Sequence, residues 1–573
     1  MGSLGRQQRR GLTFLGEGLS KGLRHPIIPW LVAVACLLTL THAYPLWKLL
    51  QRALSSEGEG LSFENIRWLL ETPRVHLALG HSLWVSAVST ALALVGGLVL
   101  AVLTTQTDLP GRGILRVLFL SPLVVPPQVL ALAWIQWAGP VGYLQQGLRW
   151  MLGKQGSLWS LYTPGGIILL LALFVLPIAY LTLVAGLSRL SKQAQEAAQL
   201  DGANLLQVWL FITLPLLRPS VAAAAALAFL GAWGNFGIPA LLGIPGRYLT
   251  LPTLLYQEVI NFGGDGFGRS AALSLLFGLP ALVFLAWPQR SQTELDPSEV
   301  PPDPYRLGWL GWLLSGILFA AALLVILGPL LAMAATALLR AYGLPLVWSS
   351  LTLEHFRLVL FDLERARRAT LHSLGLAGGA ALLCCGMATI LGYALTRLKA
   401  RLLALLSFLV DLPYALPGLI FALSLILVWL PPPLPGLNLY GTLWLILMAY
   451  LGRFLALALQ PMQAAWRSLD TSLEEAASLD GASLVQTFRH ILLPLLAPAL
   501  TAAVLLVFLQ SFAELTLSAL LVTSRSETFG WLIFGLQQGG YTHQAAALST
   551  LLVLVLFALA AGIQVLRRQV GQP

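Results

Sequence analysis

Polar residues inside apolar stretches are the first candidates for chemistry in this chain. Asp411, Arg453 and Glu514 stand in long apolar stretches of the second half, and Asn235 occupies the first-half position that matches Glu514. Charged side chains in hydrocarbon are costly, so they mark either ion pairs or the polar lining of a pathway. Arg453 could pair with either acid. A structural ion pair between helices is the plainer interpretation, and a pathway or gate is the alternative.

The other reactive side chains do not form a catalytic constellation. His81 and His372 are each followed by Ser-Leu at matched positions, and histidines at span ends serve more often as helix caps than as metal ligands. The three cysteines, Cys36, Cys384 and Cys385, stand in apolar stretches without zinc or disulfide spacing. The chain also lacks a complete phosphate-binding loop. The sequence therefore predicts no catalytic residue, no metal site and no ATP site of its own.

The composition is that of a polytopic membrane protein. Of 573 residues, 57% are hydrophobic and only 10% are charged, and the apolar stretches have the length of about 20 residues that crosses a bilayer. The net charge of +10 fits membrane-flanking charge, and no nucleic-acid partner is expected. About twelve spans are predicted, at residues 27–50, 78–104, 114–137, 165–187, 219–243, 268–287, 309–338, 371–396, 401–430, 440–464, 498–522 and 544–566.

Two polar segments between these spans carry the same sequence pattern. Glu196-Ala-Ala-Gln-Leu-Asp-Gly202 precedes Ile212-Thr-Leu-Pro215, and the pattern returns 279 residues later, beginning at Glu475. We refer to these segments as the first and second cassettes. A loop shape that occurs twice indicates a partner that binds twice.

Each cassette predicts a short helix, a glycine turn and a second short helix. Gly202 and Gly481 fit the left-handed residue that ends a helix. In the second cassette Thr471-x-x-Glu474 has the form of a capping box. The proline of each cassette is expected to mark the start of the next membrane helix. Residues that can cap the second helix come two positions after each glycine, at Asn204 and Ser483.

Further matches extend the duplication over most of the chain. His81-Ser-Leu matches His372-Ser-Leu, and Pro122-x-x-x-Pro126 matches Pro413-x-x-x-Pro417. Six predicted spans separate the cassettes, so both lie on the same side of the membrane. The matched prolines predict broken or kinked helices that flank a pathway.

The chain is therefore expected to consist of two halves in the same orientation. The predicted segments are a basic N-terminal tail (1–26), a first repeat (27–287) with its loop at about 187–218, a Pro-rich linker (288–308), a second repeat (309–566) with its loop at about 465–497, and a C-terminal tail (567–573).

The cassettes resemble the cytoplasmic loop signature of permease subunits in binding-protein-dependent ABC importers. Two copies in one chain resemble the fused branch of that family, most of all its ferric-iron permeases, with thiamine permeases related. The resemblance assigns ATPase coupling to Glu196, Ala197, Ala198, Gly202, Ile212, Leu214, Pro215, Glu475, Ala476, Ala477, Gly481, Ile491, Leu493 and Pro494.

The resemblance implies an all-α fold of two parallel six-helix repeats of the type I importer kind. It implies two copies of a cytoplasmic ABC ATPase, which bind ATP and Mg, and an extracytoplasmic binding protein that delivers the cargo. The expected location is the bacterial inner membrane, among membrane lipid, with both termini cytoplasmic. Ferric iron is the expected cargo. Thiamine, polyamine or phosphonate are the alternatives, and an ion-coupled secondary transporter is the competing class.

Overall fold

The computed structural model describes residues 28–55, 60–190, 192–262, 266–286, 305–341, 344, 346–398, 401–431, 436 and 438–569. Over these residues the secondary structure is helical, with three isolated bridges and no strand. The all-α prediction is confirmed. The predicted N-terminal tail and residues 288–304 of the predicted linker lie outside the described residues.

Helices long and apolar enough to cross a membrane account for most of the described chain. The described residues hold nine such helices, two bent helix pairs that raise the number to eleven if each is one span, and a shorter apolar helix at Phe267–Val283. The nine are Pro29–Ala53, Pro73–Thr105, Pro164–Leu187, Leu206–Trp233, Trp309–Leu338, Glu364–Arg397, Leu443–Ser468, Val485–Phe512 and Thr542–Leu559.

The two bent pairs occur at the matched proline motifs. Arg112–Leu123 is followed by Pro127–Leu152 at 107°, and Leu403–Ala415 is followed by Gly418–Trp429 at 109°. Proline removes a backbone donor and clashes with the preceding turn, so a helix breaks where two prolines stand four residues apart. The predicted broken helices are confirmed in both halves.

The membrane helix after each cassette begins with a π-helical segment. In the first half α11 (Leu205–Val208), η3 (Trp209–Thr213) and α12 (Leu214–Trp233) run on from one another. The residue before Pro215 donates its N–H to the carbonyl five residues back, at Trp209. The second half repeats this in α24 (Leu484–Thr487), η8 (Phe488–Leu492) and α25 (Leu493–Phe512). The expected separate second helix is therefore wrong, because it continues into the membrane helix.

The chain forms two compact units, and they do not coincide with the two sequence repeats. Unit 1 comprises the chain up to Leu49 with His372–Tyr414 and Phe421–Phe512, and unit 2 comprises the rest. Unit 1 therefore contains the first helix of the first half, α2 (Ile28–Leu38), together with helices of the second half. In unit 1 the ring of His42 lies 6.0 Å from that of Phe421, centroid to centroid.

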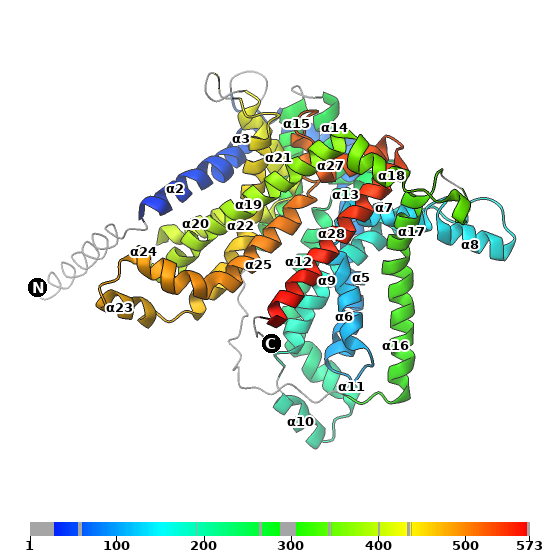
Figure 1. Ribbon diagram of the computed structural model, residues 1–573, viewed down its shortest axis with the longest axis horizontal. Coiled ribbons are helices and arrows are strands. Elements are labelled where there is room, and N and C mark those ends of the chain that lie inside the picture. The colour runs from blue at the N-terminus through cyan, green and yellow to red at the C-terminus, as the bar shows by residue number, and fades with distance from the viewer. Residues whose placement is uncertain are drawn as a thin grey trace, which may run out of the picture. The chain divides into compact units, whose positions relative to one another are not determined.

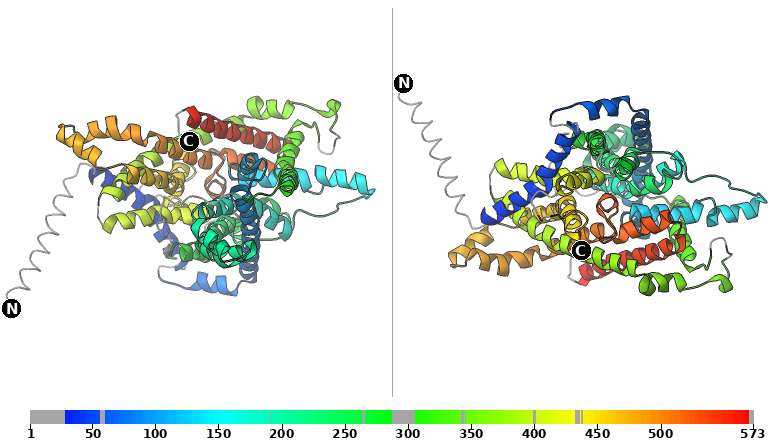
Figure 2. Two further views of the ribbon diagram at one scale, coloured as in Figure 1. Left: turned by 90° about the horizontal axis from the view of Figure 1, so that it is seen from below. Right: turned by 90° about the horizontal axis from the view of Figure 1, so that it is seen from above.

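Unit 2 is built on three packed helices of the first half, α5 (Pro73–Thr105), α9 (Pro164–Leu187) and α12 (Figure 1; further views in Figure 2). Leu100, Leu183 and Leu217 belong to one buried cluster at their crossing. The helices approach closely there because small residues line the contact. A Cβ at Gly97 would lie 3.1 Å from the backbone nitrogen of Tyr180.

The first helix of the second half also belongs to unit 2. It consists of α16 (Trp309–Ala322) and α17 (Gly328–Leu338), joined by a π-helical segment. The Ser315 hydroxyl donates to the carbonyl of Pro110 over 2.7 Å, and α17 packs on α7 (Pro127–Ala138). The first helix of each half thus belongs to a unit that also contains helices of the other half.

A histidine pair joins α17, α18 (Glu354–Arg357) and α28 (Thr542–Gln569). The rings of His355 and His543 stack with their centroids 4.8 Å apart. His355 Nε2 donates to the carbonyl of Leu339 over 3.0 Å, and His543 Nδ1 donates to that of Thr336 over 2.9 Å. Burial, followed by the charge of His543, lowers the pKa of His355 below its usual value of 6.5.

This pair predicts a loss of stability in acid. Because the folded state holds the pKa of His355 below 6.5, the unfolded chain binds the extra proton first. The free energy of unfolding is therefore expected to decrease as the pH falls from 6.5 towards the folded-state pKa. Thermal unfolding of the purified protein between pH 7.5 and 5.5 measures this, and His355→Gln should flatten the decrease. An equal decrease in the variant would contradict the assignment.

Candidate functional site

The two cassettes fold into the same helix and turn. The first contains α10 (Lys192–Leu200), and the second contains α23 (Ser472–Leu479). Gly202 and Gly481 follow in the left-handed region, with φ of 87° and 79°. In both copies the residue after the glycine donates its N–H to the second alanine of Glu-Ala-Ala, over 2.9 Å and 3.0 Å. This is the glycine-terminated helix end that the sequence predicts.

A reciprocal capping box begins the second segment of each cassette. The Asn204 side chain accepts from the N–H of Gln207 over 2.9 Å, and the Gln207 side chain accepts from the N–H of Asn204 over 2.8 Å. Ser483 and Gln486 form the same pair, over 3.4 Å and 2.8 Å. Asn204 and Ser483 are therefore confirmed as caps. The sequence signal for their partners is a glutamine three positions after each cap, at Gln207 and Gln486.

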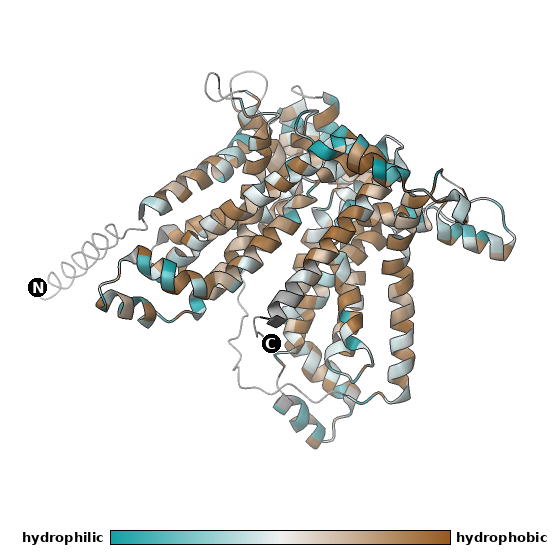
Figure 3. Cartoon of the chain, viewed as in Figure 1, coloured by the Kyte–Doolittle hydropathy of each residue, from teal (hydrophilic) through white to brown (hydrophobic). Residues whose placement is uncertain are grey.

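Large apolar side chains project from matched positions of both turns. Leu200 is 88% exposed, and its counterpart Leu479 is 87% exposed. Leu206 and its counterpart Val485 follow the glycines, at 67% and 72%. Figure 3 shows α10 as mostly hydrophilic, so Leu200 is an exception on a polar helix. Such matched apolar exposure is typical of a surface that another protein covers.

The predicted coupling residues surround these turns. The exposed ones are Glu196, Ala197, Gly202, Glu475, Ala476, Gly481, Leu493 and Pro494; Ala198, Ile212, Leu214, Pro215 and Ile491 are half-buried, and Ala477 is buried. The first cassette belongs to unit 2 and the second to unit 1.

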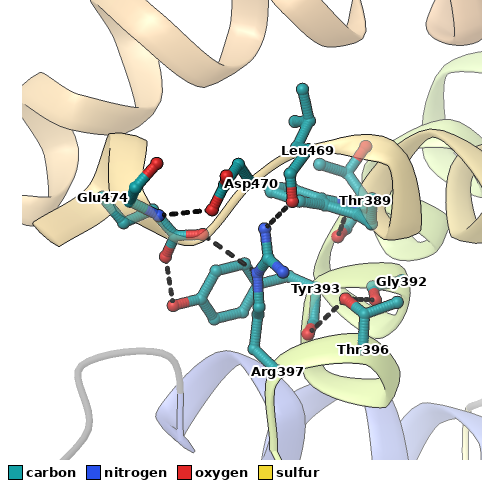
Figure 4. Close-up of polar contacts among 10 residues, drawn as sticks. Thr389, Gly392, Tyr393, Thr396, Arg397, Leu469, Asp470 and Glu474 are labelled. Carbon is teal, nitrogen blue, oxygen red and sulfur yellow. Dashed lines mark hydrogen bonds and ion pairs between the residues drawn. The ribbon is translucent and has the colours of Figure 1, made fainter.

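The second cassette is fixed to α19 (Glu364–Arg397) by a cluster of polar contacts that we call the Glu474 latch (Figure 4). Arg397 Nε lies 3.0 Å from Glu474 Oε1, and Arg397 Nη2 donates to the carbonyl of Leu469 over 2.8 Å. The Tyr393 hydroxyl donates to Glu474 Oε2 over 3.1 Å. The arginine and glutamate side chains are largely buried, which strengthens such charge-assisted bonds.

The predicted capping box of Thr471 and Glu474 is wrong, because the Glu474 side chain binds Arg397. The side chain of Thr471 does not cap α23. Asp470 takes that place, because its carboxylate accepts from the N–H of Ser472 over 2.9 Å. Hydrogen bonding to Ser472 also lowers the pKa of Asp470.

A buried tryptophan on α22 (Leu443–Ser468) holds the end of α19 that carries the latch. Trp466 Nε1 donates to the carbonyl of Thr389 over 3.2 Å, and its ring meets that of Tyr393 edge-on at 5.2 Å. A Cβ at Gly392 would lie 2.7 Å from the Trp466 ring, so the two helices are in close contact. The latch is therefore attached to a rigid helix pair.

At the positions that match the latch in the repeat, the first cassette carries other residues. By the offsets of the repeat, Gln195 replaces Glu474, Gln106 replaces Arg397 and Val102 replaces Tyr393. Gln195 Nε2 instead lies 3.4 Å from the hydroxyl of Thr213, within its own cassette. The two turns thus share a backbone but differ in how they are anchored.

Asn235 and Glu514 lie just beyond helix ends and not within spans as the sequence predicted. Helix α12 ends at Trp233 and α25 ends at Phe512. The Asn235 side chain accepts from the N–H of Ile238 over 3.1 Å, and Glu514 Oε1 accepts from that of Leu517 over 2.7 Å. Both therefore cap the next short helix, α13 (Gly237–Leu242) or α26 (Ser518–Leu521).

In unit 2 these turns meet the broken helices. Gln128, directly after the first break, donates its side-chain N–H to the carbonyl of Ala513 over 2.9 Å. A Cβ at Gly237 would lie 3.0 Å from the Gln128 nitrogen, and one at Gly234 would lie 3.7 Å from Cα of Pro417 at the second break. Non-helical backbone at membrane depth occurs only where it is buried or lines a cavity. This convergence of breaks is our candidate pathway region.

Arg453 binds backbone carbonyls at the end of α20 (Arg401–Ala415). Its Nη1 donates to the carbonyls of Pro413 and Tyr414 over 2.8 Å and 2.6 Å. Asp411 forms no hydrogen bond or ion pair with any residue that the structure describes. The expected Arg453–Asp411 pair is therefore not formed, because the helix end ahead of the break offers unpaired carbonyls to the cation. Pairing of Arg453 with Glu514 stays a prediction.

His81 is a structural contact on α5. Its Nδ1 donates to the carbonyl of Leu249 over 2.9 Å, and its ring stacks on that of Tyr248 at 3.8 Å. Across the described residues, no three His, Cys, Asp or Glu side chains gather in a group that could hold a metal ion.

Known proteins resemble the chain over most of its length. A family profile described as binding-protein-dependent transport system inner membrane component matches residues 93–341 and 387–572. The ferric transport system permease protein FbpB of Actinobacillus pleuropneumoniae is 25% identical over 513 residues, covering 88% of this chain and 73% of that protein. A probable ABC transporter permease of Sinorhizobium fredii is 25% identical over 532 residues, covering 86% of this chain and 87% of that protein. The molybdenum transport system permease ModB of Escherichia coli is 28% identical over 223 residues, covering 37% of this chain and 93% of that protein.

Proposed function

Because the chain belongs to the family of binding-protein-dependent transport system inner membrane components, it is an ABC importer permease, and we propose that it carries ferric iron across the inner membrane. The similarity to a ferric permease over 88% of the chain supports this cargo. The molybdenum permease matches only 37% of the chain and makes molybdate the second candidate. Thiamine remains the alternative from the sequence.

The proposed mechanism begins at the two cassettes. Each is seated on one copy of a cytoplasmic ABC ATPase, which binds ATP and Mg, while this chain supplies no ATP site. Closure of the ATPase pair moves the turns, and the rigid helices behind them transmit the movement. The single observation that carries this proposal is the matched exposure of Leu200 and Leu479 on two turns with the same backbone hydrogen bonds. Both termini are then cytoplasmic.

The pathway is proposed to pass the convergence of breaks in unit 2. Gln128 and Asn235 supply polar groups there, and Glu514 is the one carboxylate among the capping residues of that region. Asp411 and Arg453 are proposed as gate residues at the end of α20. The binding protein, on the side of the membrane opposite the cassettes, selects the cargo before it reaches these groups.

Uptake into proteoliposomes tests the function and the cargo together. The permease is purified with its ATPase subunits and supplied with binding protein loaded with ferric iron, molybdate or thiamine. ATP-dependent accumulation of iron alone is the expected result. Accumulation of molybdate alone would replace the cargo, and accumulation without ATP would overturn the importer assignment.

The docking role of the turns predicts a matched pair of affinity losses. Leu200→Asp and Leu479→Asp should each weaken binding of the ATPase subunit by about 2 kcal/mol, the loss typical of a central interface residue. Binding is measured by co-purification at graded salt and by titration. Leu61→Asp is the control, because Leu61 is 86% exposed and lies outside both cassettes. Equal binding by all three variants would exclude the turns as the docking surface.

A further inference from the structure

A cavity of about 150 Å³ lies at the end of α5 remote from the first cassette. Its walls come from α4 (Glu64–Glu71), the first turn of α5, α14 (Leu251–Phe262) and the start of α15 (Phe267–Ala286). The side chains that matter for its chemistry are Trp68, Arg74, Val75, Leu254, Glu258 and Arg269.

Glu258 is a buried carboxylate in the wall of this cavity. It is 5% exposed, yet it forms no hydrogen bond or ion pair with any described residue. Burial raises the pKa of Glu258, and the charges of Arg74 and Arg269 oppose that shift. Its carboxylate oxygens are not among the sealed atoms that lack a partner, so they open into the cavity and can accept a hydrogen bond from a group inside it.

Two arginines, Arg74 and Arg269, bring positive charge to the same cavity. The Arg269 guanidinium lies 5.5 Å from the centre of the Trp68 ring, in a cation–π contact. Arg74 Nη2 makes a long contact of 3.5 Å with the side chain of Gln257. Neither guanidinium is paired with a described carboxylate within 4 Å. The site therefore offers two donors for an anion beside one acceptor for a cation.

The position of the cavity places it at a membrane surface. Helix α5 has 33 residues, about 50 Å at 1.5 Å per residue, and it begins at Pro73 beside the cavity. Near its far end, Leu100 belongs to one buried cluster with Leu187, the last residue of α9, which precedes the first cassette. Leu77, one turn along α5 from Arg74 and on the same face, is 60% exposed. Tryptophan and arginine beside an exposed apolar face are typical of the headgroup layer.

We propose that this cavity binds the headgroup of a phosphatidylethanolamine molecule in the leaflet opposite the cassettes. The phosphodiester oxygens accept hydrogen bonds from Arg74 and Arg269, and the primary ammonium donates to Glu258. The acyl chains follow α5 past Leu77. Phosphatidylglycerol has no cation for Glu258, and the trimethylammonium of phosphatidylcholine has no N–H to donate. The chemistry of the wall thus selects a zwitterion that carries a primary amine.

Native mass spectrometry of the full-length chain with defined lipids tests the proposal. The wild-type protein should retain phosphatidylethanolamine about tenfold more strongly than phosphatidylglycerol or phosphatidylcholine, the value of one charge-assisted hydrogen bond. Glu258→Gln, which keeps the shape of the side chain, should abolish that preference. Arg269→Gln should weaken phosphatidylethanolamine and phosphatidylglycerol alike, whereas Arg269→Lys should weaken both less.

Glu64→Gln is the matched control, because Glu64 is an exposed acid on α4 that does not line the cavity. Its lipid preference should equal that of the wild type. Thermal unfolding identifies variants that fail to fold, and any one folded variant of Glu258 or Arg269 decides the question. Equal retention of the three lipids by the wild type, or an unchanged preference in Glu258→Gln, would overturn the proposal. Binding of free phosphorylethanolamine as strong as that of the lipid would also overturn it, since the membrane would then contribute nothing.

Discussion

Transport is expected to fall about tenfold when Gly481 is replaced by valine, while the protein still inserts into the membrane. Gly481 has φ of 79°, and no atom lies within 4 Å of the position its Cβ would occupy. The substitution therefore acts only on the backbone. A left-handed conformation costs an ordinary residue about 1–2 kcal/mol, and a β-branched residue tolerates it least. The turn that presents Leu479 should then change shape, and ATP hydrolysis should no longer drive transport.

The same experiment has two internal controls. Gly481→Asn adds a side chain of similar size that tolerates φ above zero, so it should retain most of the transport activity. Gly202→Val should repeat the loss in the first cassette, where φ is 87° and the surroundings are equally open. Transport per ATP hydrolysed is measured in proteoliposomes with the partner subunits. Normal coupling in both valine variants would show that the turns do not couple the two processes.

Removal of the Glu474 latch is expected to reduce transport per ATP by about tenfold without dissociating the ATPase. Glu474→Gln leaves Arg397 largely buried and without its carboxylate, and a hydrogen bond to a charged group contributes about 1.5–3 kcal/mol. The exposed surface of the second turn is untouched, so docking should persist. What is lost is the rigid attachment of that turn to α19 and Trp466.

A charge exchange separates an effect of the pair from an effect of either residue. The double variant Arg397→Glu with Glu474→Arg should recover part of the coupling that each single variant loses. Gln195→Ala in the first cassette is the matched comparison, since Gln195 makes only a long contact with Thr213 and its loss should have a small effect. Equal losses from Gln195→Ala and Glu474→Gln would show that the latch contributes nothing specific.

Local sequence patterns predicted the local structure of the cassettes well. Gly202 and Gly481 end their helices as expected, and Asn204 and Ser483 cap the next ones, because each of these interactions spans only a few residues. The matched prolines likewise predicted both broken helices. The ends of the spans were less predictable, since apolar residues continue past Trp233 and Phe512, where the helices stop.

The interactions that could not be predicted join residues far apart in the sequence. Glu474 looked like half of a capping box, and its true partner, Arg397, lies 77 positions away. Arg453 binds the carbonyls of Pro413 and Tyr414, about 40 positions away, which only the break in the helix leaves open. The grouping of the first helix of each half with helices of the other half is also a long-range feature that no local sequence pattern indicates.

The π-helical segments have a consequence for rotation about the helix axis. A regular helix turns about 100° per residue, so one extra residue in a turn offsets the two sides of the helix by about that angle. Such a segment ends two residues before the proline of each cassette, and again two residues before Pro45 and Pro329 in the two first helices. In one continuous helix, the direction of the face that packs within the bundle is therefore independent of the direction of the face on the other side of the π-helical segment. Sequence change on one face can proceed without rotating the other.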